Sequence, residues 1–204
     1  MNVYVESGFV LTLALQQEEH QAAEQILELA RQRRMSLRMP AFSLSEPFAT
    51  VQYRANNRHR LIDELRKELR ELGRTRPHVS LARDLDQYTI QMAQVLQTQL
   101  AAMEATVLEL SRHCQLLQLD ATVLDRASSY KTAYNLRLPD AIILVSIVLD
   151  LERALAPGDS VFISQNVKDF ENPSIQDTLQ RLNCKYLADF TNAVRFIERP
   201  GSPT

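Results

Sequence analysis

The spacing of hydrophobic and polar positions predicts alternating strands and helices at the start of the chain. Residues 2–5 form a short β-prone run, and the apolar stretch after residues 6–8 is typical of a helix entered through a tight turn. An amphipathic helix is predicted over residues 18–34, a brief strand over 37–42 and a new helix from residue 43 onward. This order indicates parallel strands joined by helices.

The middle of the chain has a different pattern. Residues 54–76 are dense in charge but keep a helical stripe of leucines at positions 61, 65, 69 and 72. After the breakers Gly73 and Pro77, residues 79–119 lack glycine and proline and read as one long helix. The two segments predict a helical hairpin inserted at about residues 55–118.

The last third returns to alternation. The pattern predicts helices over residues 120–134, 139–155 and 175–182, strands over 160–163 and 185–187, a turn at 157–159 and an exit loop over 164–170. We therefore expect one domain over residues 1–204 with an α/β fold. Its architecture should be a three-layer α/β/α sandwich with a short central parallel sheet, plus the inserted hairpin.

Composition narrows the class of protein. Of 204 residues, 45% are hydrophobic and 24% charged, so the chain can bury a core, and a net charge of −2 favours no class of partner. Cys114 and Cys184 make no ligand or redox spacing, and the start lacks a signal-peptide pattern, so we expect reduced thiols in a cytoplasmic protein. The apolar run over residues 141–151 is too short to span a bilayer of about 30 Å, so no membrane partner is expected.

Four acids lie where such a sheet forms its sites. Glu6 follows the first strand, Glu46 follows the second, Asp140 begins a helix, and Asp169 lies in the loop after the strand over residues 160–163. Sites form beyond the carboxyl ends of parallel strands, so we expect the four carboxylates to converge in one pocket. Crowded carboxylates raise one another's pKa unless a cation intervenes, and Mg²⁺ or Mn²⁺ prefers oxygen ligands.

Each acid also has a purely structural explanation. Ser43 and Glu46 have the spacing of a capping box. Asp140 suits the first turn of its helix, where the helix dipole favours a negative charge. Glu6 lies near the start of the next helix in the same way, and Asp169 fits a solvated loop. Only the conjunction of the four favours a functional site.

Four segments, in order, carry a resemblance to PIN-domain nucleases. Residues 4–7 resemble the family's opening, a hydrophobic strand followed by an acid and Ser or Thr, and residues 39–46 resemble its strand leading to a helix with a glutamate. Residues 138–141 are similar to the motif in which Asp-Ala opens an apolar helix. Residues 162–170 are similar to the motif strand, Ser/Thr-x-Asn-x-x-Asp-Phe. The match covers the chain outside roughly residues 55–118.

The resemblance implies a metal-dependent endoribonuclease that hydrolyses phosphodiester bonds of single-stranded RNA. Glu6, Asp140 and Asp169 would hold Mg²⁺ or Mn²⁺, and Glu46 would complete the catalytic acids. Three polar residues, Ser7, Ser164 and Asn166, are expected to orient these carboxylates by donating hydrogen bonds to them. The family includes toxins of toxin–antitoxin pairs, so the implied partners are RNA, an antitoxin protein and a second copy in a homodimer.

The first acidic position departs from the family, which usually has Asp where this chain has Glu6. The extra methylene moves the carboxylate by about a bond length, and misplacement by about 1 Å can cost on the order of a hundredfold in rate. The alternative is therefore a catalytically impaired protein on the same fold. It would bind a protein partner or RNA through the helical hairpin.

Other features of the sequence give weaker evidence of function. The basic residues within 54–76 either track phosphates or form a solvated helix face, and the interleaved acids favour the solvated face. The four histidines, His20, His59, His78 and His113, lack metal-ligand spacing. A hydrophobic stripe typical of a core or a partner surface is formed by Leu96, Leu100, Met103, Val107 and Leu110.

Overall fold

The structure is a computed structural model that describes residues 1–153 and 159–199. The chain divides into two compact units, which are described separately. The first, the α/β unit, comprises Met1–Pro47 and Ala105–Thr204. The second, the hairpin unit, is Phe48–Glu104 and overlaps the insertion predicted at about 55–118.

A five-stranded sheet forms the centre of the α/β unit. Its strands are β1 (Asn2–Val5), β2 (Ser36–Pro40), β3 (Gln115–Leu117), β4 (Ser160–Ile163) and β5 (Cys184–Leu187). They are all parallel, in the order β3-β2-β1-β4-β5, and Val3 of the central strand pairs with Leu37 on one side and Val161 on the other. Val3 is fully buried, as expected of a parallel sheet covered on both faces.

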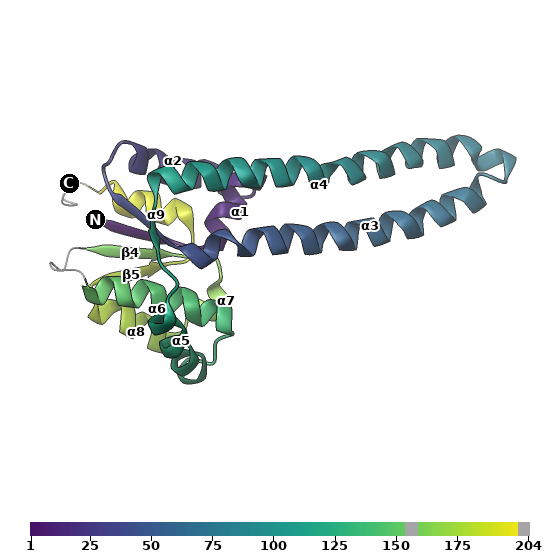
Figure 1. The fold of residues 1–204 in the computed structure, drawn as a ribbon. Coiled ribbons are helices and arrows are strands. Elements are labelled where there is room, and N and C mark those ends of the chain that lie inside the picture. The colour runs from purple at the N-terminus through teal and green to yellow at the C-terminus, as the bar shows by residue number, and fades with distance from the viewer. Residues whose placement is uncertain (154–158, 200–204) are drawn as a thin grey trace. The chain divides into compact units, whose positions relative to one another are not determined.

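Helices cover both faces of the sheet, which confirms the predicted three-layer α/β/α fold (Figure 1). One face carries α1 (Ser7–Leu15), α2 (His20–Arg31) and α9 (Phe190–Ile197). The other carries α5 (Ala121–Ala133), α6 (Leu138–Arg153) and α8 (Pro173–Arg181). The short elements η1 (Ala41–Leu44) and α7 (Val167–Phe170) follow β2 and β4.

The helix α6 is the apolar centre of its layer, because most of its residues are buried against the sheet and α5. The rings of Phe162 and Phe170 meet edge to face at 5.1 Å between centroids and close the core where β4 ends. Among residues 1–153 and 159–199, no single helix is long and apolar enough to cross a membrane, and the pair α5–α6 that passes together is bent by 116°.

Several boundaries differ from the predicted ones. The long helix predicted over 79–119 ends at His113, and β3 follows it. The strand was missed because three residues are too few to show a strand's alternating pattern. The strand predicted over 37–42 ends at Pro40, and the loop predicted over 164–170 contains α7. The helix α9 was not predicted. The end of the helix predicted over 139–155, and residues 157 and 158 of the predicted turn, lie outside the described residues.

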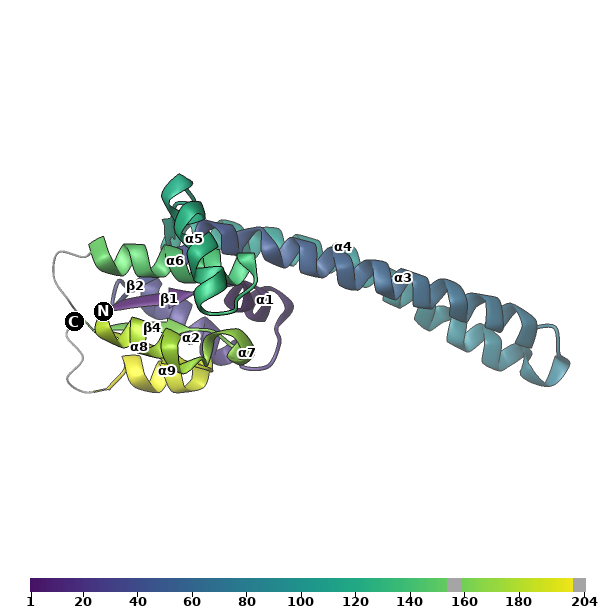
Figure 2. The same cartoon turned by 90° about the horizontal axis from the view of Figure 1, so that it is seen from below.

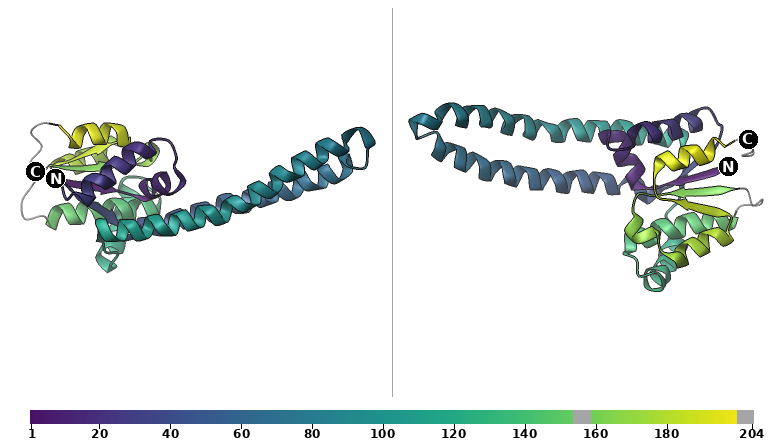
Figure 3. Two further views of the ribbon diagram at one scale, coloured as in Figure 1. Left: turned by 90° about the horizontal axis from the view of Figure 1, so that it is seen from above. Right: turned by 180° about the vertical axis from the view of Figure 1, so that it is seen from behind.

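The hairpin unit consists of two antiparallel helices that run side by side (Figure 2 and Figure 3). They belong to α3 (Glu46–Leu72) and α4 (Val79–His113), joined through η2 (Arg76–His78). Its buried side chains are Val51, Ala55, Ile62, Leu69, Ala82, Thr89 and Met103. A polar layer interrupts them, since Arg66 donates to Thr89 Oγ1 at 3.0 Å and lies 3.5 Å from Asp86.

Candidate functional site

The acids gather where the strand order changes direction. From β1 the chain adds β2 and β3 on one side and then returns to add β4 and β5 on the other. The switch therefore lies between β1 and β4, where Glu6 and Ser164 directly follow their strands. Parallel α/β sheets place ligand sites beyond the carboxyl ends of the strands at such a switch.

Glu6 caps the helix α1 and is almost fully buried. Its Oε2 accepts hydrogen bonds from the Ser7 hydroxyl at 2.6 Å and the Gly8 amide at 2.9 Å. Its Oε1 accepts one from the Ser164 hydroxyl at 3.3 Å. Burial raises the pKa of Glu6, these hydrogen bonds oppose the rise, and the charge of Asp140 adds to it.

Asn166 connects Asp140 and Asp169 to Ser164, which bonds Glu6. Its side-chain amide donates to Asp140 Oδ1 at 3.2 Å and to Asp169 Oδ2 at 2.9 Å, which uses both of its hydrogens. Its backbone amide donates to Ser164 Oγ at 3.1 Å. The segment after β4 therefore holds three of the four predicted acids in one network.

Asp140 lies in the first turn of α6, as its structural explanation requires, but it is also buried beside Asp169. Burial raises the pKa of Asp140, and the negative charge of Asp169 raises it further. Asp140 Oδ2 accepts no hydrogen bond from the described residues. Its neighbouring cation is Arg137, whose Nε lies 3.4 Å from Asp140 Oδ2 and whose Nη2 lies 3.6 Å from Asp169 Oδ2.

Glu46 is the first residue of α3 and belongs to the α/β unit. Burial raises the pKa of its carboxyl to about 7, the charges of Glu6 and Asp140 add to the rise, and the nearby Ser7 hydroxyl and Arg137 guanidinium oppose it. The capping box predicted from Ser43 is not formed, since Ser43 Oγ and Glu46 Oε2 are both buried without a hydrogen-bond partner in the described part of the chain. The residues preceding Glu46 form η1, which turns Ser43 inward instead.

As the side chains stand, no group of three or more His, Cys, Asp or Glu residues among those described is arranged to hold a metal ion. The donor chemistry still fits a hard divalent cation. Asp140 Oδ2 and Glu46 Oε2 are buried oxygens without a hydrogen-bond donor among the described residues, and a cation would satisfy them and offset the burial and the repulsion that raise both pKa values.

Three residues at this site were not predicted. Arg137 has a side chain that is 79% exposed, and its position three residues before Asp140, directly before α6, was the available signal. Gly8 lies against the Glu6 carboxylate, and the Tyr186 hydroxyl donates to the Ser164 carbonyl at 2.8 Å. Nothing in the sequence near Tyr186 indicates that contact.

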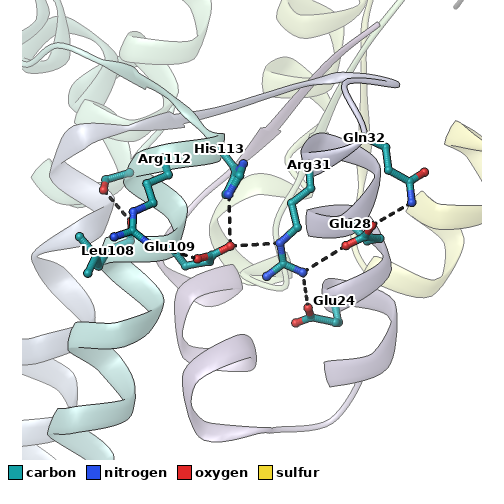
Figure 4. Close-up of polar contacts among 9 residues, drawn as sticks. Glu24, Glu28, Arg31, Gln32, Leu108, Glu109, Arg112 and His113 are labelled. Atoms are coloured by element: carbon teal, nitrogen blue, oxygen red, sulfur yellow. Dashed lines mark hydrogen bonds and ion pairs between the residues drawn. The ribbon is translucent and has the colours of Figure 1, made fainter.

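The remaining reactive side chains lie elsewhere. Burial raises the pKa of both Cys114 and Cys184 to about 12, which makes these thiols inert. His113 Nε2 lies 3.3 Å from Glu109, in a cluster where Arg31 bridges α2 to the end of α4 (Figure 4). Arg31 also contacts Glu24 at 2.8 Å. This cluster fastens two helices within the α/β unit.

No protein-family model, curated protein or solved structure matches this chain. Its resemblance to PIN-domain nucleases therefore rests on the four motifs.

Proposed function

We propose that this chain is a PIN-like endoribonuclease that hydrolyses phosphodiester bonds of single-stranded RNA with Mg²⁺ or Mn²⁺. The observation that carries the proposal is the network through Asn166, which joins buried acids at the switch between β1 and β4. Several carboxylates that share one buried site with raised pKa values are typical of a site built for a cation.

Glu6, Asp140 and Asp169 are the residues that would hold the ion. When bound, it lowers the pKa of a coordinated water and neutralises charge on phosphoryl oxygens. Asn166 keeps two of these carboxylates in a fixed orientation, and Ser164 restrains the third. The raised pKa of Glu46, about 7, suits a carboxyl that takes up or releases a proton at Oε2 near neutral pH.

Arg137 is the group best placed to contact RNA. Its guanidinium stands beside Asp140 and Asp169 while most of the side chain remains exposed. Arginine binds phosphate oxygens through paired hydrogen bonds, so Arg137 would position the substrate backbone next to the acids.

We extend the proposal to the cytoplasm, where single-stranded RNA and an antitoxin partner would be encountered. The two cysteines are free and buried, which agrees with a reducing compartment.

The test is cleavage of fluorescently labelled single-stranded RNA by the full chain with Mg²⁺ or Mn²⁺. We expect Asp140→Asn to lower the rate at least about a hundredfold, because it removes one of the carboxylates proposed to hold the ion. The control is Asp177→Asn on the exposed side of α8, which should cleave like the natural chain. Cleavage that ignores Asp140→Asn would come from a contaminant, and the proposal would fail.

A second function is favoured by the state of Glu6. Its carboxylate already accepts three hydrogen bonds, so the protein could keep the fold as an interaction module without cleaving RNA. If the natural chain is silent and Glu6→Asp switches cleavage on, the interaction function is the correct one for this sequence. If the natural chain cleaves and Glu6→Asp changes the rate only modestly, the nuclease function stands.

A further inference from the structure

The helix α4 carries an exposed apolar row within the hairpin unit. Its members recur at alternating spacings of four and three residues, the repeat of a helix that packs on another helix. They are Leu81, Leu85, Tyr88, Met92 and Val95. Leu81 is 51% exposed and Tyr88 is 62% exposed, so the row has no partner within the unit that covers it.

The helix α3 carries a matching row. It consists of Leu61, Leu65 and Leu72, which share one side of the helix and are 58%, 37% and 38% exposed, and the exposed Glu68 interrupts it between Leu65 and Leu72. These leucines lie beside the inward-facing Ile62 and Leu69, which are buried against α4. The hairpin therefore leaves several of its larger side chains outside its own core.

Both rows lie on the same face of the hairpin. Leu61 directly precedes the inward-facing Ile62, as Leu81 precedes Ala82 and Tyr88 precedes Thr89. One residue turns a helix by about 100°. In two antiparallel helices that face each other, the same step back from the inward position leads to the same side. The two rows together form one surface, here called the apolar face.

The opposite side of the hairpin is polar. The residues that directly follow the inward positions are Gln52, Asn56, Asp63, Arg70, Arg83, Ile90, Gln97 and Glu104. Ile90 is the one apolar side chain among them. The hairpin is therefore amphipathic across its width, which indicates burial of one side only.

The interior of the hairpin is partly polar, so its two helices bury little apolar surface against each other. Arg66, Asp86 and Thr89 occupy one layer between the helices. Two turns earlier on α3, Arg58 Nη1 is buried without a hydrogen-bond partner among the described residues. A unit of this size with so thin an apolar core gains little from its own burial, and a second layer of helices would supply more.

We propose that the apolar face binds the apolar face of a second copy of this chain, so that two hairpins form a four-helix bundle. The proposal concerns the hairpin unit alone and does not depend on nuclease activity. The two rows are of similar length and lie side by side, so the surface that matches them best is another pair of helices with the same rows, as in a two-fold symmetric dimer.

The area of the face agrees with a dimer. Its six exposed members present about 500 Å² of side-chain surface, and flanking side-chain stems add to the roughly 800 Å² per partner of a standard interface. The charge also agrees, because the hairpin unit has nine basic and seven acidic residues, a net charge of +2. Two copies would repel each other only weakly, whereas a surface for RNA would carry a stronger positive charge.

The test is the association state of the full chain in analytical ultracentrifugation between about 1 and 100 µM, which reaches the weak end of the affinities of standard-size interfaces. We expect the natural chain to be a dimer. Leu81→Glu combined with Tyr88→Glu should raise the dimer dissociation constant at least about a hundredfold, because it places charges on the apolar face. The matched control is Ile90→Glu, two residues from Tyr88 on the polar side, which should remain dimeric.

A second variant separates association from folding. Leu81→Ala combined with Tyr88→Ala keeps good helix formers and should still weaken the dimer by at least about tenfold. A natural chain that is monomeric up to about 100 µM overturns the proposal. The proposal fails in the same way if single-stranded RNA or another protein, and not a second copy, occupies the apolar face. A dimer that survives the paired glutamates with unchanged affinity overturns it as well.

Discussion

The backbone of Gly8 lies so close to the Glu6 carboxylate that a β-carbon at position 8 would stand 2.6 Å from Glu6 Oε1. That distance is shorter than any ordinary contact of a β-carbon. The glutamate folds back over the first turn of its own helix, where the Gly8 amide donates to Oε2 at 2.9 Å. The extra methylene of Glu6 is therefore accommodated by the missing side chain of Gly8.

We predict that Gly8→Ala displaces the Glu6 carboxylate and lowers RNA cleavage by about ten- to a hundredfold, because small misplacements of catalytic groups are costly. The rate is measured at saturating Mg²⁺. In the Glu6→Asp background the shorter side chain removes the clash, so adding Gly8→Ala should then cost much less. Equal losses in both backgrounds would show that Gly8 acts through something other than Glu6.

A second prediction concerns Asn166, whose amide bonds both Asp140 and Asp169. Asn166→Asp replaces the shared donor with a third carboxylate, so cleavage should fall by about a hundredfold, and Asn166→Ala should cost about tenfold. The control is Asn172→Asp, because Asn172 caps α8 by accepting from the Ser174 amide at 2.9 Å, which aspartate does equally well. If Asn166→Asp behaves like Asn172→Asp, the network does not position the acids.

A third prediction follows from Glu46. Its pKa is about 7 in the folded chain against an ordinary 4.5, so the folded state binds more protons between these values and stability falls as the pH rises through them. The full shift corresponds to about 3 kcal/mol, and screening of this partly exposed group reduces the expected effect to about 1 kcal/mol. Glu46→Gln should remove that part of the decline.

The measurement for Glu46 is urea unfolding at pH 5 and pH 8 without divalent cations. Burial also raises the pKa values of Glu6 and Asp140, so some decline with pH should remain in Glu46→Gln. The exposed Glu171 provides the control, since Glu171→Gln should decline like the natural chain. A Glu46→Gln variant with an undiminished decline would contradict the prediction.

The sheet was predictable wherever a strand is a continuous apolar run bounded by breakers. β1 and β4 have that form, and their places follow from the pattern alone. β3 does not, because Gln115–Leu117 is short and follows α4 without a glycine or proline to mark the change. Its position in the sheet depends on pairing with β2, which no local pattern reveals.

The site was predictable at the level of topology and not at the level of hydrogen bonds. Glu6 and Asp169 follow their strands, so their convergence could be inferred from the fold. The capping box of Ser43 and Glu46 fits the sequence equally well, but η1 buries Ser43 and leaves Glu46 facing the other acids. Tertiary packing decided between two locally valid arrangements.

The last prediction compares the contributions of two ion pairs on the helix α6 to stability. Asp150 Oδ2 accepts from the Tyr4 hydroxyl and from Arg38 Nη1, both at 2.6 Å, and ties α6 to β1 and β2. Glu152, two residues further along and on about the opposite side of α6, accepts hydrogen bonds from Arg126 at 2.6 and 2.7 Å near the surface. The side chains of Asp150 and Arg38 are only 17% and 20% exposed, against 37% and 32% for Glu152 and Arg126.

Asp150→Ala leaves the Arg38 charge and the Tyr4 hydroxyl mostly buried without their acceptor, so it should lower the free energy of unfolding by about 3 kcal/mol. Glu152→Ala releases Arg126 to water and should lower the free energy of unfolding by less than about 1 kcal/mol, although the hydrogen bonds of this pair are equally short. Urea unfolding at pH 7 measures both. Similar costs would mean that burial does not set the strength of these pairs, because hydrogen-bond geometry is nearly the same in the two.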